Sequence, residues 1–146
     1  MDPFRRLERI PVEILDPPDR LARAVAERIA RLIRERAAAG QRAVLGLATG
    51  STPVGVYREL VRMHRDEGLS FANVETFNLD EYWPMVPASV HSYHRFMREH
   101  LFDLVDLDPA RCHVPRGDIP REAVADECAR YEARIREAGG IDLQLR

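Results

Sequence analysis

Lysine is absent from this sequence: apart from histidine, its 22 basic residues are all arginines. We attribute this bias to the codon usage of a GC-rich genome. Its chemical consequence is that any phosphate bound by this segment must be held by arginine side chains or by backbone N–H groups. The 24 acidic residues leave a formal net charge of −2, which indicates neither a nucleic-acid partner nor a polyanionic one.

Cysteine and long apolar runs are scarce as well. The two cysteines, Cys112 and Cys128, form no Cys-x-x-Cys pair and are too few for a disulfide framework. Cys128 falls on the apolar face of a predicted helix, so we expect it to be a buried thiol. The first residues lack the apolar core of a signal peptide, and no apolar run has the length of a membrane span. We therefore expect a cytoplasmic protein without a membrane partner.

Short apolar runs alternate along the chain with segments of helical period. Strands are predicted at residues 10–15, 43–47, 74–77, 112–114 and 141–145, and helices at residues 20–39, 53–67, 93–105 and 120–138. This order indicates one α/β domain over residues 1–146, Rossmann-like, with an open, mostly parallel sheet and helices on both faces. Such sheets bind ligands beyond the carboxyl ends of their strands.

The first candidate site is the turn after the strand at 43–47, which reads Thr49-Gly50-Ser51-Thr52. We expect Thr52 to cap the following helix, with Pro53 at its first position. The glycine lets the backbone approach a ligand, the free N–H groups of the helix point at the turn, and three hydroxyls add donors. A phosphate or carboxylate fits such a turn, although it lacks the Gly-Lys-Ser/Thr ending of a Walker A loop. An ordinary strand-to-helix turn with a capping threonine explains the same residues.

The second candidate site follows the strand at 74–77, where Asp80 and Glu81 lie side by side in the sequence. Adjacent carboxylates at a strand end point in roughly opposite directions, so at most one faces the ligand. A carboxylate there can act as a general base, especially where partial burial raises its pKa. Taken alone, the pair is better explained by a turn that Asp80 caps, with Glu81 in solvent.

Other catalytic patterns are missing. Four histidines stand out, His91, His94, His100 and His113, but no carboxylate completes a metal-ligand pattern beside them and His-Glu-x-x-His does not occur. We expect surface or hydrogen-bonded histidines and no metal. Without a nucleophile elbow or Gly-x-Gly-x-x-Gly, neither acyl-enzyme nor dinucleotide chemistry is indicated.

Taken together, these segments resemble the glucosamine-6-phosphate deaminase family, also described as glucosamine/galactosamine-6-phosphate isomerases. Order and spacing agree from about Ile10 to Leu145. The matching stretches are Leu45–Pro53, Ser70–Phe71, Thr76–Tyr82, Ser92–Tyr93, Phe96–Met97 and Gly139–Leu143.

The resemblance implies a hydrolytic deamination coupled to isomerisation: glucosamine 6-phosphate and water give fructose 6-phosphate and ammonia, with no cofactor. The turn from Thr49 through Gly50 and Ser51 to Thr52 would hold the phosphate. Asp80 would move a proton between C2 and C1 of the opened sugar, giving an enolamine and then an imine that water hydrolyses. Tyr82 and Tyr93 would belong to the substrate site. A homo-oligomer is compatible with the sequence, which does not fix the oligomeric state.

The family continues, after the strand that matches residues 141–145, with a Gly-rich turn and a Gly-His…Phe-Asn-Glu-Pro segment. That segment carries the ring-opening histidine and further phosphate-binding residues. This sequence ends at Arg146, so we expect a truncated, N-terminal portion of such an enzyme that is inactive by itself.

Two other functions remain open. The 6-phosphogluconolactonases share the fold and a similar Gly-Ser-Thr-Pro loop, but they typically have arginine where this chain has Tyr82 and asparagine where it has Tyr93. A non-catalytic sugar-phosphate sensor is the second. Such regulators usually carry a helix-turn-helix segment, and none precedes residue 43.

Overall fold

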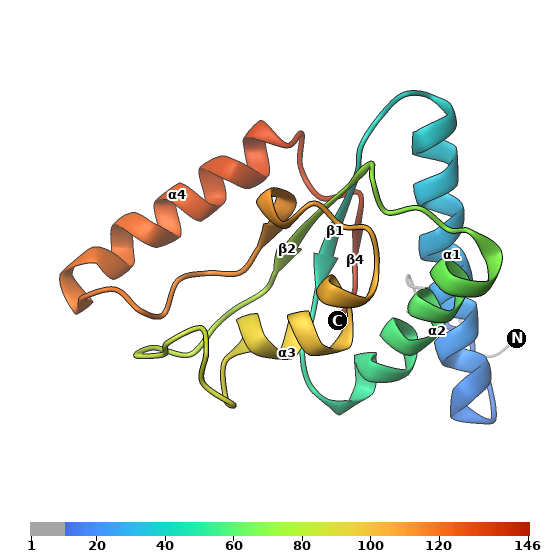
Figure 1. The fold of residues 1–146 in the computed structure, drawn as a ribbon, viewed down its shortest axis with the longest axis horizontal. Helices are drawn as coiled ribbons and strands as arrows, with labels where there is room; N and C mark the ends of the chain where they lie inside the picture. The colour runs from blue at the N-terminus through green and yellow to red at the C-terminus, as the bar shows by residue number, and fades with distance from the viewer. Residues whose placement is uncertain (1–10) are drawn as a thin grey trace, which may run out of the picture.

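A small parallel sheet organises the fold (Figure 1). The structure is a computed structural model that describes residues 11–146. The sheet has the order β3-β2-β1-β4, and all of its strand pairs are parallel. Its strands are β1 (Ala43–Leu47), β2 (Val74–Asn78), β3 (Cys112–His113) and β4 (Leu143–Gln144). Both central strands, β1 and β2, are buried along their whole length, as strands covered on two faces must be.

Helices cover both faces of this sheet, as predicted from the sequence. The α-helices are α1 (Pro18–Ala38), α2 (Ser51–Glu67), α3 (Tyr93–His100) and α4 (Val124–Glu137), and the short 3₁₀ turns are Phe102–Leu104, Pro109–Arg111 and Arg121–Ala123. In Figure 1 the sheet stands between α4 on one side and α1 with α2 on the other. Among the described residues, no helix combines the length and the hydropathy that crossing a membrane requires.

Alternate residues of the strands supply two separate hydrophobic clusters, because successive side chains of a strand point to opposite faces. Leu45 and Leu47 of β1 pack into the larger cluster with α1, α2 and α3. Val44 of β1 and Phe77 of β2 pack against Tyr131 of α4 on the other face. The five consecutive apolar positions of β1 are therefore shared between two cores.

Tyr131 fixes how α4 lies against the sheet. Its hydroxyl is 2.7 Å from the carbonyl oxygen of Asn78 and 3.0 Å from that of His113. Its ring meets Phe77 edge-on, with centroids 5.7 Å apart. Burial raises the pKa of the Tyr131 phenol, so the hydroxyl stays a donor to the ends of β2 and β3.

This orientation of α4 corrects one prediction. Cys128 was expected to be buried, but it is exposed. Glu127 and Tyr131 are the residues of α4 that are buried. They are one turn apart and share a face. The buried face of α4 is therefore centred on Glu127 and Tyr131, and Cys128 lies outside it.

The N-terminal strand and two helix bounds also differ from the predictions. Ile10 lies outside the described residues, and residues 11–15 form no strand; their side chains are mostly exposed, and none pairs with the sheet. The helix predicted at 93–105 ends at His100 and passes into a 3₁₀ turn. The last α-helix starts only at Val124, after a 3₁₀ turn that follows Pro120.

Candidate functional site

The carboxyl ends of β1 and β2 lie at the same level of the sheet. Leu47 of β1 is opposite Asn78 of β2, and the Leu79 N–H donates to the Leu47 carbonyl at 3.1 Å. The segments that follow the two strands therefore begin side by side. They contain the two groups of residues that the sequence singles out, Thr49–Thr52 and Asp80–Tyr82.

The turn after β1 leads into helix α2, whose N-terminus lacks a side-chain cap among the residues described. Helix α2 begins at Ser51 with Gly50 as its N-cap, so the predicted capping role of Thr52 is wrong. Gly50 has φ +101°, a conformation that is strained for any residue with a side chain. This glycine therefore lets the helix start at Ser51, before the predicted start at residue 53. Within the described part of the chain, no side chain caps α2, and its first turn contains no acidic residue. The positive end of the helix dipole is left for an anion.

A buried tyrosine fastens this turn to α2. The Tyr57 hydroxyl donates to the Ala48 carbonyl, and the Ala48 N–H is 3.2 Å from the hydroxyl oxygen. Tyr57 is fully buried, and burial raises the pKa of its phenol. The backbone just ahead of Thr49 is thus held in place before any ligand arrives.

After the two strands, the rings of Tyr82 and Tyr93 lie against each other, and Thr49 and Asp80 are near enough to influence the Tyr93 phenol. The pKa of the Tyr93 phenol is raised above its ordinary value, first by the Tyr82 hydroxyl and then by burial. The Thr49 hydroxyl lowers it, and the negative charge of Asp80 raises it. The rings of Tyr82 and Tyr93 have centroids 5.0 Å apart. We call these four residues, with Gly50, Ser51 and Thr52, the strand-end site.

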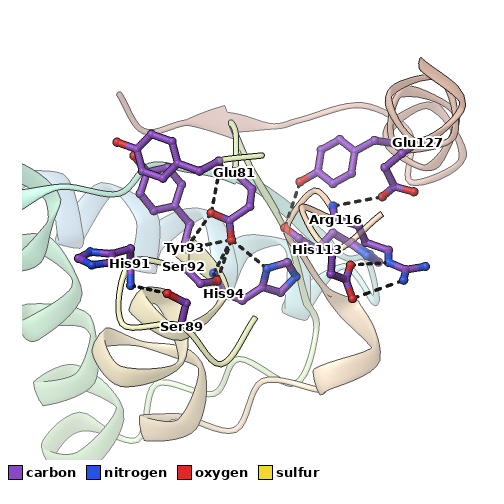
Figure 2. Close-up of polar contacts among 12 residues, drawn as sticks. Glu81, Ser89, His91, Ser92, Tyr93, His94, His113, Arg116 and Glu127 are labelled. Carbon is purple, nitrogen blue, oxygen red and sulfur yellow. Dashed lines mark hydrogen bonds and ion pairs between the residues drawn. The ribbon is translucent and has the colours of Figure 1, made fainter. Parts of the chain in front are cut away.

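Asp80 and Glu81 turn in opposite directions, as adjacent residues after a strand do. Asp80 is exposed, so the partial burial that would suit a general base is not present. Glu81 was expected in solvent, yet its side chain is only 2% exposed. Figure 2 shows Glu81 at the centre of a set of hydrogen bonds to Ser92, Tyr93 and His94.

The ionised form of Glu81 is favoured by these bonds. Burial by itself would raise the pKa of Glu81, but hydrogen bonds from the Tyr93 N–H, the Ser92 hydroxyl, His94 and the Tyr82 N–H hold it below its ordinary value. The sequence carried a signal for this residue. If only one carboxylate of an adjacent pair faces the ligand, the other must face the protein.

The histidines make contacts within the protein. His94 Nδ1 is 3.2 Å from Glu81, and His113 Nε2 is 2.9 Å from Glu75. His64 Nδ1 lies 2.7 Å from the Leu69 carbonyl, while His91 is exposed. Within residues 11–146, no three histidine, cysteine or acidic side chains are grouped as metal ligands.

Two cavities lie close to α2. One of about 480 Å³ borders Ser51 and Thr52, with walls from α1 and from residues after β4. The other, of about 490 Å³, lies between α2 and α3 and contains Arg62 and Arg65. These two arginines already pair with Glu59 and Asp66, so the first cavity is the better continuation of the strand-end site.

Comparison with known proteins places this chain in a family. Residues 16–145 match the family described as glucosamine-6-phosphate isomerases/6-phosphogluconolactonase, and the chain belongs to that family. Glucosamine-6-phosphate deaminase 2 of Bacillus subtilis (strain 168) is 47% identical over 116 residues, covering 80% of this chain and 46% of that protein.

Solved structures agree with this assignment. The structure of a monomeric glucosamine-6-phosphate deaminase matches with a TM-score of 0.86 and 38% identity, covering 92% of this chain and 54% of that one. A 6-phosphogluconolactonase from Thermotoga maritima matches with a TM-score of 0.68 and 24% identity, covering 84% and 53%, and so shares the fold. The chain spans about half the length of these relatives.

Titration of the Tyr93 phenol tests whether Tyr82 and Asp80 lie close to it. Tyr82→Phe removes the hydroxyl that most raises the pKa of Tyr93, so we expect that pKa to fall towards its ordinary value. Asp80→Asn removes a negative charge that disfavours the phenolate, and should shift the pKa the same way by a smaller amount. Carbon-NMR titration of the tyrosine rings, assigned with Tyr93→Phe, measures both shifts.

Asp66→Asn, which changes an exposed carboxylate near the end of α2, is the control and should leave the titration of Tyr93 where it is. A Tyr93 that titrates unchanged in both Tyr82→Phe and Asp80→Asn would show that these side chains do not meet.

Proposed function

We propose that this chain supplies the phosphate-binding turn and the catalytic base of a glucosamine-6-phosphate deaminase. The observation that carries the proposal is the strand-end site: an uncapped helix N-terminus and an exposed carboxylate, Asp80, at the ends of adjacent parallel strands. The identities to proteins named glucosamine-6-phosphate deaminase support the same function.

The turn at Thr49–Thr52 binds the phosphate. A dianionic phosphate is attracted to the positive end of α2, and the exposed hydroxyls of Ser51 and Thr52 add donors. Because the sequence has no lysine and the strand-end site contains no arginine, backbone N–H groups carry most of this recognition. The rigid attachment of Ala48 to Tyr57 keeps those groups aimed without a conformational cost on binding.

Asp80 acts on the carbons at the other end of the sugar. In the opened substrate it removes the proton from C2; the C–H electrons form a C1=C2 bond while the C1=O π electrons move to O1, which takes up a proton from water, giving an enolamine. The same carboxyl group returns its proton to C1, where the C1=C2 electrons form the new C–H bond, while the amine nitrogen forms the C=N bond of an imine at C2 and gives up a proton to water. Water adds to that imine and ammonia leaves, so glucosamine 6-phosphate and water become fructose 6-phosphate and ammonia. One carboxylate serves both carbons because they are bonded to each other.

Tyr82 and Tyr93 support a deaminase over a lactonase. Their paired rings stand beside Thr49 and Asp80, in the positions where lactonases of this fold typically have arginine and asparagine. We assign them to the wall that the sugar contacts.

Gly50→Val tests phosphate binding. A β-branched residue is strained at φ +101° and crowds the approach to the helix N-terminus. We expect the affinity for glucosamine 6-phosphate to fall roughly tenfold to a hundredfold, the loss of one charge-assisted hydrogen bond of about 1.5–3 kcal/mol. The affinity for glucosamine should change little. Calorimetry with both ligands separates the two.

Gly40→Val is the matched control, because Gly40 also has a positive φ and open space around it but lies at the end of α1. If Gly50→Val weakened both ligands equally, the turn would not be a phosphate site.

Asp80→Asn tests the base. This chain, joined after residue 145 to the remaining part of the Bacillus subtilis relative, is incubated with glucosamine 6-phosphate in deuterated water. NMR then follows hydrogen exchange at C2. We expect exchange to slow by roughly 10²–10⁴-fold, the usual contribution of a general base, with substrate binding retained.

Asp66→Asn, an exposed carboxylate near the end of α2, should exchange at the unmodified rate. Exchange that persists in Asp80→Asn would leave a sugar-phosphate-binding domain whose base lies elsewhere.

A further inference from the structure

One carboxylate closes the loop that crosses from β2 to α3. This segment, the 82–92 loop, runs from Tyr82 to Ser92 and exposes apolar side chains, among them Trp83, Val86 and Val90. Trp83 is the only tryptophan of the chain. An exposed apolar loop has little burial to order it, so its conformation depends on the few polar contacts that it makes.

Those contacts are concentrated on Glu81. At the start of the loop, the Tyr82 N–H donates to Glu81 Oε1 at 2.9 Å. At its far end, the Ser92 hydroxyl donates to Oε2 at 2.8 Å, and the Tyr93 N–H is 3.1 Å and 3.0 Å from the two oxygens. His94 Nδ1 completes the set at 3.2 Å. A carboxylate only accepts hydrogen bonds and has two oxygens to do so, which suits it to gathering donors from both ends of a loop.

The middle of the loop has its own attachment on the other side. The Met85 N–H donates to the Gly117 carbonyl at 2.8 Å, and Trp83 Nε1 donates to the Ile119 carbonyl at 2.8 Å. A Cβ at Gly117 would lie 2.3 Å from the Tyr82 carbonyl oxygen, so the loop packs directly on the Gly117 backbone. Glu81 and the 117–119 segment thus hold different parts of the same loop.

The residue that begins the loop, Tyr82, and the residue that follows it, Tyr93, both belong to the strand-end site. Tyr82 and Tyr93 are bound to Glu81 through their backbone N–H groups, while their rings lie together beside Thr49 and Asp80. Glu81 itself is buried, and its neighbour Asp80 is exposed. The two carboxylates therefore have different environments: Asp80 faces the proposed ligand, and Glu81 faces the protein.

We propose that Glu81 is a positioning residue that sets the placement of Tyr82 and Tyr93 in the strand-end site by holding the backbone at both ends of the 82–92 loop. Its effect on the loop stands on the contacts alone. Its effect on affinity for the sugar phosphate rests on the proposed function.

The test compares Glu81→Gln with Glu132→Gln. Glutamine has the shape of glutamate but keeps one acceptor oxygen and turns an NH₂ group towards donors. Glu132 is an exposed carboxylate of α4, so it matches the charge change outside the loop. Acrylamide quenching of Trp83 fluorescence in the ligand-free chain reports the loop, and calorimetry with glucosamine 6-phosphate reports the site.

We expect Glu81→Gln to remain folded by circular dichroism, to increase the quenching of Trp83, and to weaken binding of glucosamine 6-phosphate roughly tenfold. Glu132→Gln should match the unmodified chain in both measurements. If Glu81→Gln does not fold, His94→Leu, which removes one side-chain contact of Glu81 and keeps the Ser92 cap of α3, should show the same changes to a smaller degree.

Unchanged quenching of Trp83 in a folded Glu81→Gln variant would overturn the proposal, whatever the affinity. Increased quenching with unchanged affinity would also overturn it, because Tyr82 and Tyr93 would then not depend on the loop. If the unmodified chain binds no glucosamine 6-phosphate while quenching rises in Glu81→Gln, the proposed function fails and the hold of Glu81 on the loop stands.

Discussion

The parallel register of β1 and β2 places Leu47 opposite Asn78, and this register brings the turn at Thr49–Thr52 and the segment that begins at Asp80 to the same edge of the sheet. A slip of two residues would keep the same side chains in each core, since the pleat repeats every two residues. It would nevertheless move the ends of the two strands apart by about 6.6 Å, two residues at about 3.3 Å each. Asp80 would then no longer lie beside the turn at Gly50. The buried, two-sided packing of β1 and β2 is what holds the register.

Buried tyrosines fix both strand ends from opposite faces. Tyr57 of α2 holds Ala48 after β1, and Tyr131 of α4 reaches the Asn78 carbonyl at the end of β2. Each hydroxyl binds a backbone carbonyl that has no further strand neighbour, so the frame of the site does not depend on the residues that face the ligand. Glu81 extends the same arrangement to the 82–92 loop. Because Tyr57, Tyr131 and Glu81 hold the backbone in place, the residues proposed to contact the sugar phosphate can be polar and exposed.

Much of this could be predicted from local sequence. The five apolar residues of β1 define that strand at both ends, and the order of strands and helices indicates the parallel sheet and hence the edge on which a ligand binds. What could not be predicted depends on contacts between distant segments. Cys128 is exposed because the buried face of α4 is centred on Glu127 and Tyr131, and Glu81 is buried because Ser92 and Tyr93 return to it from the start of α3. Gly50 rather than Thr52 is the N-cap of α2, in a backbone conformation of positive φ that composition does not specify.

We propose that the turn after β1 and the segment after β2 form one site for a sugar phosphate. Nitrogen–proton correlation NMR of the chain, titrated with glucosamine 6-phosphate, is the decisive measurement. We expect the largest shifts to fall together on the amides of Gly50, Ser51, Asp80 and Tyr82, with α4 unaffected. Shifts centred instead on Arg62 and Arg65, in the cavity between α2 and α3, or confined to only one of the two segments, would contradict it.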